Sequence, residues 1–176
     1  HAKANFRSFM HIMYPQNSEQ QYIIADVHEK LIQLVQDCFD GNINPHQIIS
    51  LPPQHGKSRL LSVRAVAWLI GAKPGIHIAL TGFSTDLLAD FVGEVKRIVE
   101  NPRYFLIFGD VKPMVGHDRS NDIIFTNQSN LQARSCGSKL TGRRVDWLVV
   151  DDPHAGREEA ESPAMRRRVH RWFFAD

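Results

Sequence analysis

Residues Ile48–Leu60, with the sequence IISLPPQHGKSRL, decide the fold of this chain. An apolar stretch at 48–51 enters a loop that ends in Gly-Lys-Ser, and apolar residues at helical spacing then continue to about Ile70. Backbone N–H groups of such a loop, together with the N-terminus of the following helix, point at an anion. The segment therefore predicts a strand at 48–51, a phosphate-binding loop and a helix. The predicted nucleotide-binding residues are Pro53, Gln54, His55, Gly56, Lys57, Ser58 and Arg59.

Two side chains of the loop have specific tasks in this interpretation. Lys57 reaches the outer phosphates of a nucleotide, and the Ser58 hydroxyl takes one position on a bound Mg²⁺. The motif departs from its usual form at Leu51, where a glycine is expected, and the two prolines that follow stiffen the loop and remove two N–H donors. A chance occurrence of Gly-Lys-Ser is the alternative, and the order strand, loop, helix argues against it.

A second segment, Asp146–Pro153, supplies carboxylates. Its sequence DWLVVDDP predicts a buried strand that ends in Asp151 and Asp152. Ligands of open parallel sheets gather beyond the carboxyl ends of the strands. Asp151 is therefore expected beside the loop as a Mg²⁺ ligand, and Asp152 as the group that orients or deprotonates the attacking water. An ordinary strand followed by an Asp-Asp-Pro turn is the alternative.

With both segments in place, the chain resembles the large terminase subunit of tailed bacteriophages, the ATPase that packages viral DNA. Residues 51–58, LPPQHGKS, are similar to the deviant Walker A motif of that family. Residues 137–146 resemble the glycine-rich lead-in to its Walker B strand, and residues 151–153 and 166–173 resemble the strand end and the next helix. His28 lies upstream of the loop, where members often carry a histidine.

The resemblance, over roughly residues 20–174, implies an ATPase domain that uses ATP and Mg²⁺ to drive double-stranded DNA into a procapsid. It implies partners as well: copies of the chain in a ring on a portal protein, and a small terminase subunit, in the host cytoplasm. Asp152 stands where a catalytic glutamate is usual, so Glu158 and Glu159 are fallback candidates. Gln54 stands where many relatives have an arginine.

Arg143 and Arg144, in a glycine-rich loop before the second strand, could supply the missing positive charge. An arginine delivered to a neighbouring subunit's nucleotide stabilises the charge of the transition state. Solvation of both side chains, or contact with DNA phosphates, are the alternatives. The run at residues 166–168 could also face DNA, although a solvated charged helix face is the commoner meaning.

Two rival functions share the loop. One is another nucleic-acid-dependent P-loop ATPase such as a helicase, which would use the same Lys57, Ser58 and Asp151. The other is a non-catalytic assembly module, in which a degenerate loop binds nucleotide or nothing and docks partners. Leu51 and Asp152, which depart from the usual pattern, keep this second possibility open.

Composition sets looser bounds. The 176 residues, 43% of them hydrophobic, suffice for one core, and a net charge of +2 does not by itself argue for nucleic-acid binding. Cys38 and Cys136 are expected to be reduced, and no segment matches a membrane span or a signal peptide. We expect an N-terminal arm or helix at 1–25 and a P-loop ATPase domain at 26–176, without a nuclease domain.

The remaining pattern predicts an α/β fold of the RecA-like P-loop NTPase type, with a mainly parallel sheet flanked by helices. Beyond the elements already given, four features are expected. They are a helix at 26–39, a strand at 76–82, a helix capped at Ser84 or Thr85 that stops at Asn101-Pro102, and a hairpin at 122–126 and 131–135. A last helix is expected to begin at Ser162-Pro163.

Overall fold

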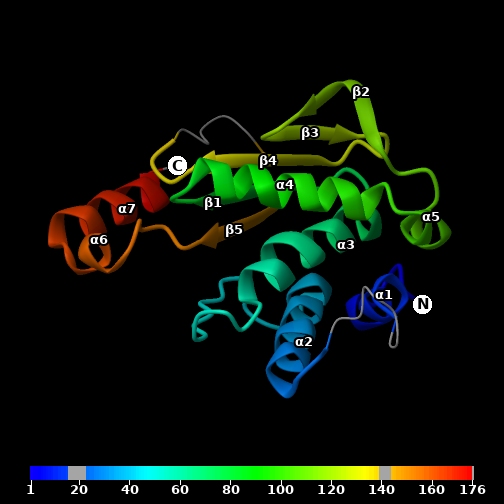
Figure 1. Ribbon diagram of the computed structural model, residues 1–176, viewed down its shortest axis with the longest axis horizontal. Coiled ribbons are helices and arrows are strands. Elements are labelled where there is room, and N and C mark those ends of the chain that lie inside the picture. The colour runs from blue at the N-terminus through cyan, green and yellow to red at the C-terminus, as the bar shows by residue number, and fades with distance from the viewer. Residues whose placement is uncertain (16–22, 139–143, 176) are drawn as a thin grey trace.

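The computed structural model describes residues 1–15, 23–138 and 144–175. It is an α/β structure in which helices flank a five-stranded mixed sheet of order β2-β3-β4-β1-β5. Figure 1 shows α4 lying along the sheet, with α6 and α7 at one end of the molecule and α1 and α5 at the other. The elements are α1 (Phe6–Met13), α2 (Asp26–Asp40), the π-helical segment η1 (Arg59–Arg64), α3 (Ala65–Ala72), β1 (His77–Gly82), α4 (Thr85–Val99), α5 (Pro102–Phe108), β2 (Pro113–Arg119), β3 (Asp122–Phe125), β4 (Asn130–Ser135), β5 (Trp147–Asp151), α6 (Arg157–Glu161) and α7 (Pro163–Ala175).

The sheet is half parallel and half antiparallel. β1 pairs in parallel with β4 on one side and β5 on the other, while β3 pairs antiparallel with both β4 and β2. The predicted hairpin is confirmed as β3 and β4, but a mainly parallel sheet is wrong because the missed strand β2 adds a second antiparallel pair. The sequence of β2, PMVGHDR, is largely exposed and lacks the alternating pattern that marks a half-buried strand.

The predicted strand at 48–51 is also wrong, because these residues belong to no strand. Ile48 is fully exposed, whereas Ile49 and Leu51 pack partly against the core. A strand exists only where a neighbour pairs with its backbone N–H and C=O groups. Within the described residues β5 is the last strand of the sheet, and the segment before the loop does not pair with it.

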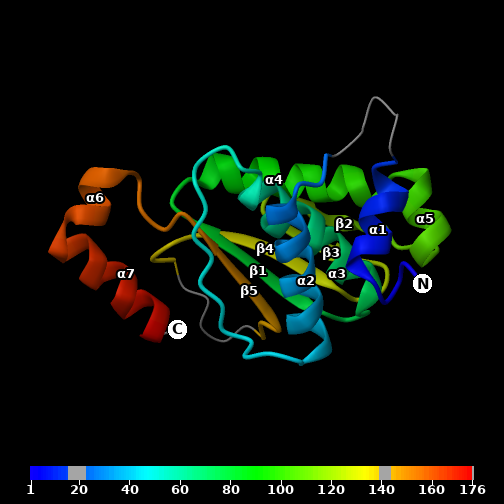
Figure 2. The ribbon, with the colours of Figure 1, turned by 90° about the horizontal axis from the view of Figure 1, so that it is seen from below.

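The helix after the loop is confirmed, and it starts with a π-helical segment. η1 runs directly into α3, where the run Ala65–Ile70 is buried on every side. The N-terminal residues form helix α1, whose Phe6 ring lies 5.2 Å from the ring of Trp68 in α3. Figure 2 views the molecule from below, so α1 and α2 lie nearer the viewer than β2 and β3. This core fixes the helix that carries the end of the loop.

Capping residues set the other helices. Gly41 ends α2 in the left-handed conformation, and the Ser84 side chain accepts a hydrogen bond from the Leu87 N–H at the start of α4, as predicted. Asn101 and Pro102 follow the end of α4, but they also start the missed helix α5, with Asn101 as its N-cap. α7 begins at Pro163 as predicted, and the short α6 was missed. No described helix is both long and apolar enough to cross a bilayer.

Candidate functional site

The loop and the end of β5 meet, although they are far apart in the sequence. The three parallel strands end level with one another, because Gly82 of β1 is in register with Ser135 of β4 and with Asp151 of β5. Lys57 Nζ lies 3.3 Å from Asp152 Oδ1 and 3.9 Å from Asp151 Oδ1. The fold therefore brings one lysine and two carboxylates together at the carboxyl edge of the sheet.

The two carboxylates have different surroundings. The side chain of Asp151 is 8% exposed and that of Asp152 is 76% exposed, while the side chain of Lys57 is 25% exposed. A nearly buried carboxylate is costly unless a cation or hydrogen-bond donors face it. Asp151 is thus enclosed by the protein and faced by Lys57, whereas Asp152 reaches into solvent, where a water molecule can approach it.

Backbone contacts hold the junction that carries these carboxylates. Asp152 has φ 41°, in the left-handed region that few residues other than glycine adopt, and the Phe83 N–H donates to its carbonyl oxygen over 3.1 Å. Gly82 leaves no space for a side chain, because a Cβ there would lie 2.5 Å from the Asp151 carbonyl oxygen. The tight approach of β1 to the end of β5 therefore positions both aspartates.

The loop has its own constraints. Gln54 and Gly56 have φ 65° and 72°, so the chain turns twice through the left-handed region. The His55 Nδ1–H donates to the Pro53 carbonyl oxygen over 2.9 Å, since a carbonyl oxygen can only accept. Proline cannot offer an N–H here, but its carbonyl ties the histidine to the loop. The peptides that precede Lys57 consequently lie in a defined turn.

Ser62 is a site residue that the sequence analysis missed. Its buried hydroxyl donates to Asp151 Oδ2 over 3.3 Å. Ser58, the predicted Mg²⁺ ligand, lies four residues earlier, immediately before the π-helical segment η1. No pattern in the sequence indicates Ser62, because its contact depends on how η1 packs against the end of β5.

We expect Ser62→Ala to weaken Mg²⁺-dependent binding of an ATP analogue by roughly 2- to 12-fold, because Asp151 would lose the hydroxyl that orients it. Calorimetric titration measures this. Ser129→Ala is the matched control, since the buried Ser129 hydroxyl donates over a similar 3.4 Å to the Ile70 carbonyl, at the opposite end of the strands. Equal effects of the two substitutions would show that Ser62 does not act through Asp151.

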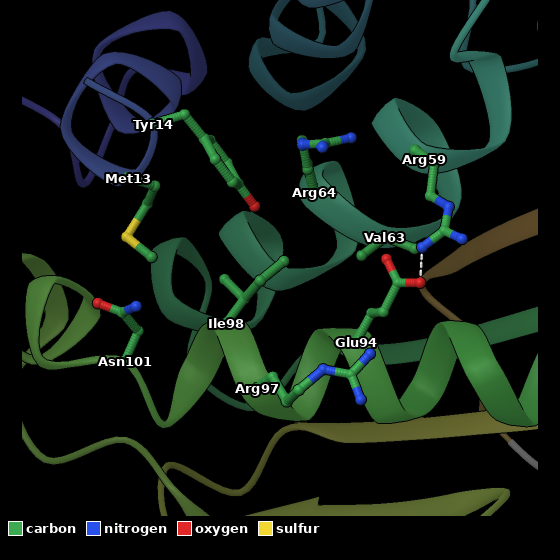
Figure 3. A pocket seen from close by; sticks show the side chains of 9 residues that line it. All are labelled: Met13, Tyr14, Arg59, Val63, Arg64, Glu94, Arg97, Ile98 and Asn101. Carbon is green, nitrogen blue, oxygen red and sulfur yellow. Dashed lines mark ion pairs between the residues drawn. The ribbon is translucent and has the colours of Figure 1, made fainter. Parts of the chain in front are cut away.

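Arg59, the residue after Ser58, is one of the residues that line a cavity of about 420 Å³. The Arg59 guanidinium forms an ion pair with Glu94 of α4, as Figure 3 shows, and lies 6.0 Å from the centre of the Phe91 ring. Arg64 stacks on the Tyr14 ring at 4.9 Å. The remaining lining residues are Met13, Val63, Arg97, Ile98 and Asn101. The cavity is in the size range of small-molecule sites and combines cationic groups with an apolar wall.

Of the two candidate arginines, Arg144 is described, whereas Arg143 lies outside the described residues. The Arg144 side chain is 70% exposed and pairs with Asp146 Oδ1 at 3.0 Å. The other carboxylate oxygen of Asp146 accepts a hydrogen bond from the His77 N–H. This bond lowers the pKa of Asp146, and the contact with Arg144 lowers it further by a smaller amount. Arg144 is thus held at the start of β5, and it would have to leave Asp146 to reach a nucleotide.

The remaining candidates do not meet Lys57. Glu159 accepts the Ala155 N–H at the start of α6, and Glu158 is exposed. The arginines at 166–168 are all exposed on α7.

Cys38 and Cys136 are free thiols, and burial raises the pKa of each of them.

No protein-family model, curated protein sequence or solved structure significantly matches this chain. The proposal for its function therefore rests on the motifs of the sequence and on the geometry of the site.

Proposed function

We propose that this chain is an ATPase domain of the large terminase type, which hydrolyses ATP with Mg²⁺ to move double-stranded DNA. The observation that carries the proposal is the position of Lys57 within 3.3 Å and 3.9 Å of carboxylate oxygens of Asp152 and Asp151. A lysine after a glycine turn and two aspartates at a strand end are the parts that phosphoryl transfer needs. We also propose that the chain has the P-loop NTPase fold, with which the observed α/β architecture is compatible.

The residues of the site divide the work as follows. Lys57 would exchange its aspartate partners for the outer phosphates, and the N–H groups at the start of the helix would hold the phosphate chain. Asp151 and Ser58 would hold Mg²⁺, which suits their hard oxygen donors. The metal would neutralise charge on the phosphates. The exposed Asp152 carboxylate would accept a proton from, or orient, the water that attacks the γ-phosphate.

The cavity that Arg59 helps to line is the place that we propose for the nucleoside of the bound nucleotide. Arg59 is the second residue after Lys57, so the phosphates at the loop and a nucleoside in this cavity would lie in adjoining places. The cavity there has a volume of about 420 Å³ and the apolar side chains of Val63 and Ile98. Arg59 and Arg64 also line it, but they contact Glu94 and the Tyr14 ring and would have to exchange these partners for a base. Planar guanidinium groups stack on aromatic rings such as a nucleobase.

The DNA-packaging assignment rests on the resemblance of the sequence motifs. Within it, the exposed arginines 166–168 of α7 are the proposed contacts to DNA phosphates, and Arg143 or Arg144 is the proposed trans-acting arginine of a ring. The portal protein, the small terminase subunit and the host cytoplasm belong to the same proposal.

The experiment is steady-state ATP turnover of the purified chain with Mg²⁺, measured at rising protein concentration with and without linear duplex DNA. The proposal expects Mg²⁺-dependent turnover that DNA stimulates and that rises more than linearly with protein, because a neighbouring copy supplies the arginine. Separation of DNA strands during turnover would favour the helicase alternative. A folded chain that neither binds nor hydrolyses ATP would favour the assembly module.

A further inference from the structure

His28 joins the first turn of α2 to the phosphate loop. The His28 Nε2 atom lies 3.0 Å from the His55 carbonyl oxygen, and its Nδ1 atom lies 3.0 Å from the Ala25 backbone nitrogen. Through these contacts His28 reaches His55, which is 27 positions away in the sequence, and Ala25, which is three positions away. One imidazole therefore bridges the start of a helix and the turn that precedes Lys57.

The partners of the ring fix its tautomer. The Ala25 N–H can only donate, so Nδ1 of His28 must accept and carries no proton. The His55 carbonyl oxygen can only accept, so Nε2 must carry the proton and donate. Both requirements select the same neutral form of the ring. His28 thus accepts from the helix with one nitrogen and donates to the loop with the other.

The bond to the loop orients a peptide group. In a trans peptide the C=O of His55 and the N–H of Gly56 point in opposite directions. Holding the carbonyl toward His28 therefore turns the Gly56 N–H away from α2. Within the described part of the chain, no hydrogen bond occupies that N–H. Gly56 has φ 72°, and because glycine adopts positive and negative φ about equally readily, its own backbone preference does not fix this peptide.

We propose that His28 is a positioning residue for the phosphate loop, which holds the His55–Gly56 peptide with its N–H directed at a bound phosphate. This inference rests on the proposed function, since it assigns His28 to the same nucleotide site. It adds a residue that lies outside the loop, on a separate helix. A purely structural role would instead use His28 only to satisfy the Ala25 N–H at the start of α2.

Two substitutions separate these roles. His28→Asn places an amide oxygen near the position of Nδ1, so it can still accept the Ala25 N–H, but it is too short to donate to His55. His28→Gln extends an amide nitrogen to the position of Nε2, and glutamine at this position of a helix also suits the capping of its first turn. The loop bond is thus lost in the first variant and can be kept in the second.

The experiment measures Mg²⁺-dependent binding of a non-hydrolysable ATP analogue by calorimetry, thermal unfolding, and backbone amide shifts of residues 54–58 by NMR without nucleotide. We expect His28→Asn to bind roughly 2- to 12-fold more weakly, the usual contribution of one hydrogen bond, and His28→Gln to stay within about twofold of the wild type. His28→Gln should unfold at the wild-type temperature, and His28→Asn about 1–6 °C lower, because it loses one hydrogen bond. Only His28→Asn should shift the amide signals of Gly56 and Lys57.

Wild-type affinity in His28→Asn, or equal losses in both variants, would overturn the positioning role. A second readout keeps the inference separate from the proposed function. If the wild-type chain binds no nucleotide, the proposed function fails, and the amide shifts decide about His28 alone. Loop signals that are unchanged in His28→Asn would then overturn the link between His28 and the loop.

Discussion

Lys57→Ala is expected to weaken binding of a Mg²⁺–ATP analogue by roughly 10- to 150-fold. Hydrogen bonds to charged groups contribute about 1.5–3 kcal/mol, and each 1.4 kcal/mol changes affinity tenfold. The ammonium group of Lys57 also faces the nearly buried Asp151 at 3.9 Å, so its loss leaves the site more negative for an incoming triphosphate. Calorimetric titration measures the change in Kd.

Lys73→Ala is the control for this substitution. Lys73 is exposed and follows the end of α3 that lies away from the loop. Its substitution removes the same charge without touching the site. Lys73→Ala should leave the unfolding temperature unchanged, whereas Lys57→Ala should lower it, because the nearly buried Asp151 loses the cation that faces it. Thermal unfolding therefore accompanies the titration, which is carried out where both variants are folded. A Kd for Lys57→Ala equal to that of Lys73→Ala would remove Lys57 from the site.

Asp152→Asn is expected to lower ATP turnover by about 10²–10⁴-fold while Kd for the ATP analogue changes little. A positioned general base contributes a rate factor of that order, and asparagine has nearly the shape of aspartate but cannot take a proton. The exposed Asp152 side chain has no buried charge to leave unpaired, so the fold should not suffer. Turnover and binding are measured on the same preparation.

Two comparisons make this result specific. Asp90→Asn, at an exposed position of α4, controls for loss of one carboxylate. Glu159→Gln tests the fallback base, whose carboxylate accepts the Ala155 N–H in the structure. If Glu159→Gln abolishes turnover and Asp152→Asn does not, the base assignment moves to α6. Full turnover in both variants would mean that neither carboxylate is the base.

The elements that the sequence predicted well carry their signals locally. β1 contains the buried apolar run 78–80, and α2 and α4 have apolar stripes with capping residues such as Ser84 and Gly41 at their ends. The segment at 48–51 is equally apolar, yet it forms no strand, because a strand also needs a partner that no local pattern reveals. β2 shows the converse, since pairing with β3 makes a strand from a sequence without alternation.

The candidate site also has some features that the sequence predicts and others that it does not. The meeting of Lys57 with Asp151 and Asp152 was predicted, but only the aspartates lie at the carboxyl end of a strand. Lys57 follows no strand, so the reason that the sequence offered for its position is wrong. The contacts that tune the site could not be predicted. The bond from Ser62 to Asp151 and the left-handed conformation of Asp152 depend on how η1 and β1 approach the end of β5. Such packing has no signature in the sequence of either segment.

The most direct test of the account is a calorimetric titration of the wild-type chain with a non-hydrolysable ATP analogue and Mg²⁺, repeated in the presence of inorganic tripolyphosphate and in the presence of EDTA. The account predicts saturable binding of one nucleotide per chain, competition by tripolyphosphate because the loop holds the phosphates, and weaker binding when the metal is removed. Absence of binding by a chain that is demonstrably folded would contradict it. Binding that tripolyphosphate leaves unchanged would also contradict it, because the nucleotide would then be held elsewhere than at the loop.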